Sequence, residues 1–265
     1  MFNLDKLPKL TRQTIEGDAK LRALFKKLPT RLLEVNNAKT VKGESLGYLT
    51  GVMYLAPADA SGIVMCAMAE TAKCKAPCLF TAGRGVMSNV MYPRLRKTLA
   101  FQQHRDWFMV LLRNEVARLE RRATRLGLKL AVRLNGTSDV RWENELIDGK
   151  SIMEWFPNVQ FYDYTKLPNR RNLPKNYDLT FSASAAPGFG RYMVQAAASG
   201  MRLAYVLRTP ERVAHFVNVA GTLAGFPAVD GDEHDLRFLN PQGVAVLLYA
   251  KGRAKNDTAG LVFDL

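Results

Sequence analysis

The sequence predicts an α/β protein built as a (β/α) barrel of the TIM-barrel kind, either complete or incomplete and distorted. Seven strand-like runs, rich in branched and aromatic residues, alternate with helical or loop segments, which is typical of a mostly parallel sheet. The chain has 265 residues and 48% hydrophobic content, a common size for such a barrel. No Gly-x-Gly-x-x-Gly motif and no complete Walker motif occurs, which disfavours an open nucleotide-binding sheet.

Each expected strand is bounded by residues that end extended structure. The first, at 46–55, is followed by Pro57, and the one at 128–134 lies between Gly127 and Asn135-Gly136. Five more are expected at 159–164, 177–182, 201–207, 226–229 and 244–250.

The clearest expected helix runs from Pro93, a residue suited to a first helical turn, to Gly127, a natural C-terminal stop. Its apolar residues recur at steps of three and four and form one stripe: Phe108, Leu111, Leu112, Val116, Leu119, Ala123 and Leu126. Shorter helices are expected at 151–155 and at 187–198, the second ending before Gly200.

The chain divides into a basic N-terminal extension and one large domain. Residues 1–40 are polar and basic and contain a short expected helix at 15–28. Residues 41–265 hold all the expected strands and form a single α/β barrel-like domain. No internal repeat or low-complexity segment separates them further.

All three cysteines of the chain, Cys66, Cys74 and Cys78, fall within thirteen residues, directly after the first expected strand. The count is odd and no secretory signal precedes it, so a disulfide framework is disfavoured. The N-terminus lacks an apolar signal core and no run of about 18 apolar residues occurs, so we expect a cytoplasmic protein without a membrane span.

Clustered thiolates are typical ligands of a metal centre. An iron–sulfur cluster, of the 4Fe-4S type in particular, is held by cysteine thiolates, and three of them would leave one iron open to another ligand. Zinc is the alternative, but a structural zinc site takes four ligands; His104 could be the fourth, although nothing in the sequence singles it out. Three free thiols without metal are the remaining reading. The spacing differs from the Cys-x3-Cys-x2-Cys signature of radical S-adenosylmethionine enzymes, which therefore remain only an analogy.

Polar residues gather where the expected strands end, and in parallel α/β folds the carboxyl ends of the strands form the active site. Arg133 offers a planar fork for a carboxylate or phosphate, and Asp139 could orient it. Asp163 and Lys166 could transfer protons or bind phosphate. These four are the candidate catalytic residues. Other strands end in polar stretches at 180–184, 229–237 and 251–252.

Residues 230–235 contain Asp230, Asp232, His234 and Asp235, a set with divalent-metal character. An acidic turn explains the same residues and is the preferred interpretation.

The net charge of +14 favours contact with polyanions such as nucleic acid or nucleotides. The polar face of the long helix carries five arginines, which form either a solvated face or a nucleic-acid surface: Arg113, Arg118, Arg121, Arg122 and Arg125.

Several strings together resemble a family encoded by bacteriophages and mobile elements, the gene-product-88-like proteins. They include residues 37–43 and 46–57, the cysteine segment through Arg84, and the stretches 133–139, 161–166, 176–182, 230–237 and 250–252. The resemblance covers residues from about 37 to 265 and fits least well at 213–223. It implies a phage origin and marks the same strand ends, but it implies no particular activity.

The sequence is therefore consistent with three alternative functions. The first is an iron–sulfur protein, and an enzyme, that takes a small-molecule substrate at the open iron. The second is a nucleic-acid-binding phage protein with a structural metal site. The third is a protein that acts by binding a bacterial partner. The sequence indicates no oligomeric state.

Overall fold

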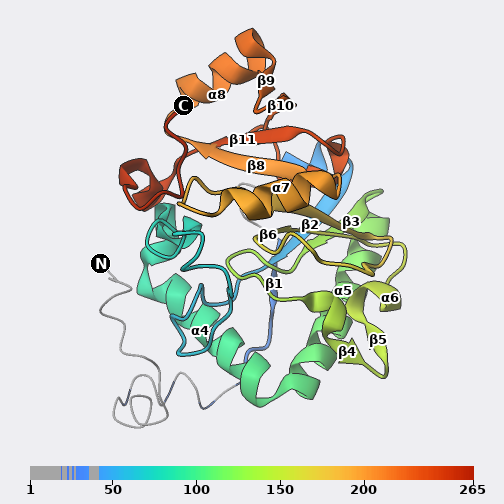
Figure 1. Ribbon diagram of the computed structural model, residues 1–265. Coiled ribbons are helices and arrows are strands. Elements are labelled where there is room, and N and C mark those ends of the chain that lie inside the picture. Colours follow the sequence, from blue (N-terminus) through green and yellow to red (C-terminus); the bar gives the residue numbers. More distant parts are fainter. Residues whose placement is uncertain (1–18, 20–22, 24–25, 27, 36–41) are drawn as a thin grey trace.

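The computed structural model describes residues 19, 23, 26, 28–35 and 42–265, and its centre is one large, mostly parallel sheet (Figure 1). The strands follow the order β1-β2-β3-β6-β7-β8-β11-β10-β9. Their bounds are β1 Leu33–Glu34, β2 Tyr48–Met53, β3 Lys129–Arg133, β6 Gln160–Thr165, β7 Tyr177–Ser182, β8 Arg202–Leu207, β9 Thr222–Leu223, β10 Phe226–Asp230 and β11 Ala245–Tyr249.

All seven strands expected from the sequence are present and pair in parallel, from β2 through β11 to β10. The two short outer strands, β1 and β9, pair antiparallel with their neighbours. The α/β class and the parallel sheet are therefore confirmed. Among the described residues no pairing joins β9 to β1, so the sheet is not seen to close into a barrel.

Strands β2, β3, β6, β7 and β8 are neighbours in the same order in which they follow one another along the chain, as in a (β/α) barrel. Strand β11 then inserts between β8 and β10, although β10 precedes it in the sequence. A separate hairpin, β4 (Leu146–Ile147) and β5 (Lys150–Ser151), lies outside the large sheet.

The long helix expected from Pro93 to Gly127 is two helices, α4 (Ser88–Gln103) and α5 (Arg105–Arg125). The chain turns at His104, whose backbone angles (φ −136°, ψ 52°) are not helical. Pro93 lies inside α4 rather than at its start, because the helix begins five residues earlier, at Ser88. Gly127 follows α5 with a φ of +68°, the left-handed conformation that ends many helices.

The remaining helices are short, and all but the last, η7, lie between strands along the chain. Ser151 starts α6 (Ile152–Trp155) with a capping box, because its hydroxyl accepts from the backbone N–H of Glu154 while the Glu154 carboxylate accepts from the backbone N–H of Ser151. The others are η2 (Leu79–Thr81), η3 (Gly83–Val86), η4 (Trp142–Asn144), α7 (Gly190–Ala198), α8 (Pro210–His215), the π-helical turn η5 (Phe216–Ala220), η6 (Arg237–Leu239) and η7 (Gly252–Asn256).

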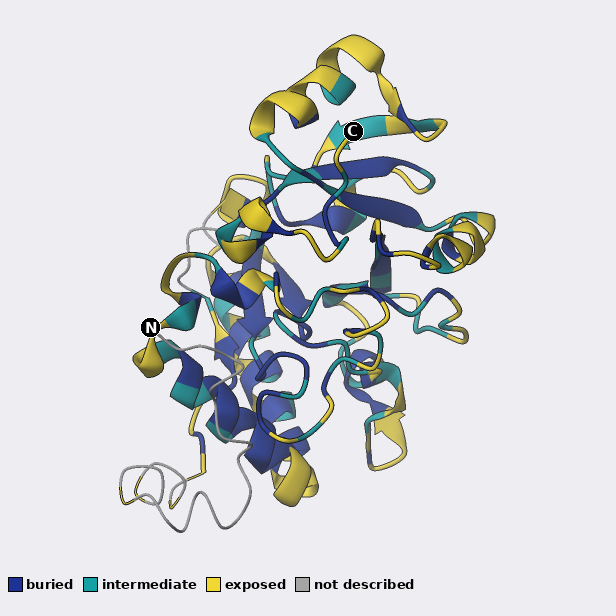
Figure 2. Ribbon diagram, turned by 60° about the vertical axis from the view of Figure 1, so that its left-hand side comes forward, coloured by how far each residue is buried: buried dark blue, intermediate teal, exposed yellow. Residues whose placement is uncertain are grey.

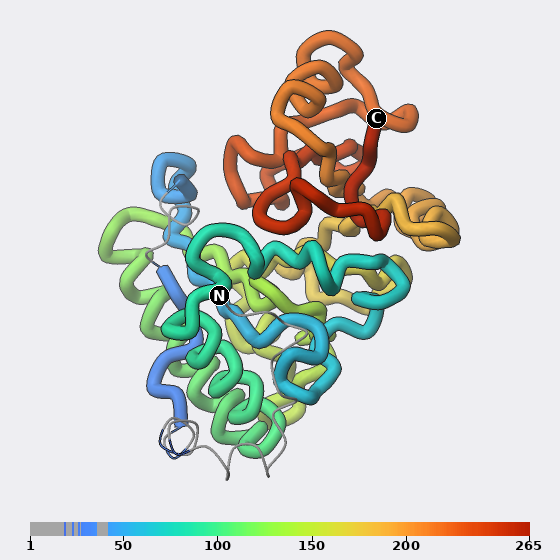
Figure 3. Tube along the Cα trace, turned by 90° about the vertical axis from the view of Figure 1, so that its left-hand side faces the viewer, coloured from blue at the N-terminus to red at the C-terminus, as the bar shows by residue number. Residues whose placement is uncertain are grey.

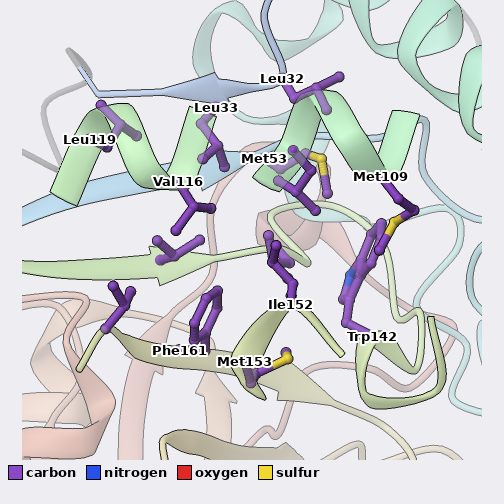
Figure 4. Packing of buried hydrophobic residues seen from close by; sticks show 14 of the residues in the cluster. Leu32, Leu33, Met53, Met109, Val116, Leu119, Trp142, Ile152, Met153 and Phe161 are labelled. Carbon is purple, nitrogen blue, oxygen red and sulfur yellow. The ribbon is translucent and has the colours of Figure 1, made fainter. Parts of the chain in front are cut away.

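The largest core fills the space between helix α5 and one face of the sheet (Figure 4). Val116 and Leu119 of the helix face Phe161 of β6, while Met109 lies beside Trp142. Buried residues are concentrated on the sheet and on the inward side of α4 and α5 (Figure 2). The C-terminal segment, with α8, β10 and β11, lies at the other end of the molecule from α4 and α5 (Figure 3).

The opposite face of the sheet carries smaller clusters. On β3, Leu130 and Val132 belong to the large core, whereas Ala131 packs with Tyr162 and Leu236 on the other face. Because side chains alternate along a strand, Arg133 shares the face of Ala131. This smaller face and the carboxyl ends of its strands position the candidate site.

The expected N-terminal helix at 15–28, and most of the extension 1–40, lie outside the described residues. No helix in the part of the chain that the structure describes is both long and apolar enough to span a membrane.

Candidate functional site

The cysteines lie on a loop, residues 55–82, that leaves β2 and crosses the carboxyl ends of the parallel strands. Side chains and backbone from distant strands hold it there. The Ser184 hydroxyl, just past β7, donates to the Ala72 carbonyl oxygen over 2.7 Å. The backbone N–H of Arg253, past β11, donates to the Thr81 hydroxyl over 3.1 Å. The loop is therefore anchored to residues that follow β7 and β11.

Beneath this loop is a cavity of about 230 Å³ that collects most of the residues expected at the strand ends. Cys66, Cys74 and Cys78 all line it. The strands and the turns that follow them contribute Arg133, Asp139, Tyr164, Lys166, Ser182 and Lys251. Side chains from several strand ends therefore meet in one cavity, with the three thiols in its wall.

The three thiols are half-buried and free of disulfide bonds. The Cys66 thiol lies 3.9 Å from the carbonyl oxygen of Thr137, and the Cys74 thiol 3.7 Å from that of Ala69. Burial raises the pKa of all three thiols, that of Cys78 to about 11. Because each pKa lies above its ordinary value, each group is a neutral thiol at pH 7 when no metal centre is bound.

A single metal ion has no preformed site here. Among the described residues no group of three or more His, Cys, Asp or Glu side chains is arranged to hold one. His104, the expected fourth zinc ligand, is exposed between α4 and α5 and does not line the cavity. A zinc ion, with bonds of about 2.3 Å to sulfur, would require the three cysteines to move together. An iron–sulfur cluster is several ångströms across and spans more widely spaced thiolates.

Lys166 brings a buried positive charge to the thiols. Its Nζ donates to the carbonyl oxygen and hydroxyl of Ser182 and to the carbonyl oxygen of Ala183, over 2.9 to 3.0 Å. Burial lowers the pKa of this ammonium, while Cys74 and Asp139 raise it. The three acceptors can satisfy the three N–H bonds of the charged form and hold the ammonium in place.

Arg133 is held by Asp235, which comes from the acidic stretch 102 residues further along the chain. Nη1 of Arg133 lies 2.9 and 3.1 Å from the two carboxylate oxygens of Asp235, and the Tyr162 hydroxyl lies 3.3 Å from one of them. The guanidinium also stands over the Tyr164 ring, 4.8 Å from its centre. Burial lowers the pKa of Arg133, but Asp235, Tyr164, Tyr162 and Asp163 together raise it above its ordinary value, so the side chain remains charged.

Asn135 organises the turn after β3. Its side-chain oxygen accepts from Ser138, from the Val140 backbone and from the Trp142 indole, over 2.9 to 3.0 Å. Its backbone N–H donates to Asp163 over 2.7 Å. The turn residues 136–139 line the cavity and are positioned by this network.

Two of the candidate catalytic residues are placed differently from the expectation. Asp163 is fully buried and does not line the cavity, because it lies on the face of β6 that Phe161 presents to the large core. It accepts from Asn135 and from the Tyr177 hydroxyl and therefore positions the turn. Asp139 lines the cavity but does not orient Arg133; it accepts from the backbone N–H of Lys166 and lies 3.9 Å from Arg170.

We expect Asp163 to make the stability of the protein depend on pH. Burial raises the pKa of this carboxyl to about 7, against the lowering effects of Arg133 and its hydrogen bonds. The folded state therefore holds a proton that the unfolded chain loses near pH 4, so the free energy of unfolding falls as pH rises from about 4 to 7. Asp163→Asn removes this titration. In urea unfolding, the free energy of unfolding of wild type should fall relative to that of the variant when the pH is raised from 5 to 8. An equal difference between the two proteins at both pH values would contradict the raised pKa of Asp163.

The acidic stretch 230–235 is a turn, as preferred from the sequence, and its carboxylates have separate partners. Asp230 accepts from the backbone N–H of Asp232, which forms an ion pair with Lys251. Asp235 pairs with Arg133, and Arg237 donates to the carbonyl oxygen of His234. The described side chains of this stretch do not converge on a metal site.

Sequence reasoning missed the arginine that follows β6. Arg170 is almost fully buried and pairs with Glu143 and, at 3.9 Å, with Asp139. Its neighbours Asn169 and Arg171 are a polar pair typical of a surface loop, so composition gave no signal for its burial.

The fold and the cavity together define a class: an α/β protein with a mostly parallel sheet and, at the carboxyl ends of its strands, a cavity lined by three thiols and several charged side chains. The model of the family described as Gene product 88 matches residues 27–264. The chain therefore belongs to the Gene product 88 family, and the resemblance seen in the sequence is confirmed. Searches of curated proteins and of solved structures found no match.

Proposed function

We propose that the protein binds an iron–sulfur cluster, 4Fe-4S in type, through Cys66, Cys74 and Cys78, and that it is a phage enzyme of the cytoplasm. One observation carries the proposal: three cysteines separated by up to twelve positions line one cavity, beside a buried lysine. The sheet that supports the cavity would be an incomplete (β/α) barrel, since its first parallel strands follow barrel order.

The charges around the thiols support this proposal. Three thiolates carry three negative charges, and a cluster with two positive charges leaves a net charge of about −1. Lys166, held as a cation by Ser182 and Ala183, offsets it inside the protein. Without such a centre the neutral thiols and the lysine have no evident reason to share a cavity wall.

The cavity also suits a substrate. An iron left without a cysteine would supply Lewis-acid or electron-transfer chemistry when the cluster is bound. The chain's own residues would orient a small molecule beside it: Arg133 through its guanidinium, and Asn135 through the turn that it holds. The loop 55–82 would keep bulk water away from the cavity.

Iron and sulfide analysis after anaerobic reconstitution tests the proposal. Wild-type protein should bind about four irons per chain and absorb broadly in the visible range. Cys74→Ala should lose most of the iron and the absorption. Met68 also lines the cavity, but its thioether is a weaker iron ligand than a thiolate. Met68→Leu should therefore retain the iron and the absorption. A colourless, iron-free wild-type protein would refute the cluster, and stoichiometric zinc in its place would support the zinc alternative.

The alternative proposal is nucleic-acid binding by the arginine face of α5. Arg118, Arg121 and Arg125 are exposed and, with Thr124, line a hollow in the surface. Arg113 is less available, because it pairs with Asp148 and stands over the Trp155 ring. The exposed arginines follow the helix axis and match the spaced charges of a phosphate backbone.

Reversing the charges of Arg118, Arg121 and Arg125 to glutamate should abolish most binding to a random-sequence DNA duplex. The slope of log affinity against log salt should fall by about three, since each lost phosphate contact removes about one released counterion. The matched control reverses three exposed charges elsewhere: Arg171, Arg212 and Lys255. If both triple variants bind as wild type does, or weaken equally, α5 is not a binding face.

A further inference from the structure

The side of the cavity that the strands form, opposite the cysteine loop, is mostly apolar and aromatic. We define this strand side by Arg133, Tyr164, Val206, Leu248 and Tyr249, which come from β3, β6, β8 and β11 and line the cavity. Four of the five are apolar or aromatic, and Arg133 is the one charged member of this set. A surface of this kind binds small organic molecules, with its few polar groups fixing their orientation.

The guanidinium of Arg133 donates hydrogen bonds through one of its three nitrogens. All its described hydrogen bonds pass through Nη1 to Asp235, and its Nε, which is buried, donates to no described residue. The side chain is only 8% exposed. A buried donor without an acceptor costs about 1–3 kcal/mol, so an acceptor supplied by a bound ligand would offset this cost. A guanidinium carries five donors in a planar fork, the geometry that matches a carboxylate or phosphate.

The charges that line the cavity favour an anion. The acids Asp139 and Asp235 are each matched by an arginine, Arg170 and Arg133. Lys166 donates to neutral oxygens alone, and Lys251 adds another cation whose partner, Asp232, is outside the lining. The wall therefore carries three cationic side chains against two acids, before any thiolate is counted.

We propose that the strand side of the cavity binds a small organic anion, whose carboxylate or phosphate group is recognised by Arg133 and whose apolar body packs on Leu248 and Val206. The inference rests on the proposed function, since it names the substrate class of the same cavity. It does not require the cluster, because Arg133 and its neighbours are in place without one.

Isothermal titration with benzoate, phenyl phosphate and neutral benzamide tests the inference. These probes share one apolar ring and differ in charge. Wild-type protein should bind one or both anions at least about tenfold more tightly than benzamide. The preferred anion distinguishes a carboxylate from a phosphate ligand. Absence of binding by both anions, or equal binding of benzamide, overturns the inference.

Two variants connect the binding to the strand side. Arg133→Lys keeps the charge beside Asp235 but loses the planar fork, and should weaken anion binding about tenfold or more. Leu248→Phe leaves the ion pair intact and fills the apolar wall, so it tests the site even if Arg133→Lys does not fold. Unchanged affinity in a folded variant of either kind overturns the inference.

The same titrations on iron-free and on anaerobically reconstituted protein separate the two proposals. Anion binding by a protein that takes up no iron would contradict the cluster alone. Iron uptake without anion binding would contradict the anion site alone.

Discussion

Replacing Asp235 by alanine is expected to lower the free energy of unfolding by about 3–5 kcal/mol, because it leaves the buried charge of Arg133 without its partner. The carboxylate receives both hydrogen bonds of Arg133 Nη1 and lies 3.3 Å from the Tyr162 hydroxyl. Both members of the pair are less than one tenth exposed, so the loss of the acceptor is poorly compensated by bulk water. Urea unfolding at constant pH measures the loss.

Two further variants test whether the loss of stability arises because the ion pair is buried. Glu70→Ala removes an exposed partner of Lys75 and should cost less than about 1 kcal/mol. The double variant Arg133→Met/Asp235→Leu removes both charges together and should recover most of the lost stability. If Asp235→Ala costs no more than Glu70→Ala, the ion pair is not the buried contact that the structure shows.

Gly252→Ala is expected to have the second largest effect, because no side chain fits where β11 ends against the cysteine loop. A Cβ atom on Gly252 would lie 2.7 Å from the backbone nitrogen of Ala82 and 2.7 Å from the carbonyl carbon of Thr81. The φ of +57° adds the cost of a left-handed conformation, about 1–2 kcal/mol. The loop must therefore shift, or the turn at 252 must open.

Gly200→Ala is the matched control. Its φ of +75° imposes the same kind of backbone strain, but an added Cβ meets nothing within 4 Å. Gly252→Ala should therefore destabilise by roughly 1–3 kcal/mol more than Gly200→Ala, the cost of overpacking. It should also reduce iron uptake, because Thr81 and Cys78 belong to the same turn. Equal stability losses in the two variants would show that the cysteine loop shifts to accommodate the added Cβ atom at little cost.

The strands of the sheet were predictable because each is a short run of apolar residues with a breaker beside it. Gly127 and Asn135-Gly136 set the limits of β3 within one or two residues. The strand order was less accessible. Nothing in the run at 244–250 indicates that it inserts between β8 and β10, since that depends on pairing between segments about 40 residues apart.

The break at His104 was also not predictable, because the apolar stripe of α5 continues the periodicity of α4. The sequence around it, Gln102-Gln103-His104-Arg105, contains neither proline nor glycine. Tertiary packing decides the break: Phe101 and Phe108, on either side, both contact Trp142.

The sequence predicted which residues line the cavity better than it predicted what each of them does there. The rule that strand ends meet at one edge correctly brought the cysteines, Arg133 and Lys166 to one cavity. The alternation of side chains along β6 could have excluded Asp163, which shares a face with Phe161 rather than with Tyr162 and Tyr164. The pairing of Arg133 with Asp235 could not be read, because many acids of the chain were equivalent partners.

The insertion of β11 between β8 and β10 has a consequence during synthesis. Strand β10 leaves the ribosome before β11, yet β11 is its parallel partner in the finished sheet. Until residues 245–249 emerge, β10 has only the two-residue β9 to pair with, and the wall contributed by Tyr249 and Lys251 does not exist. The nascent chain therefore cannot complete the cavity until translation has passed this strand, so the binding that we propose for the cavity must follow the synthesis of β11.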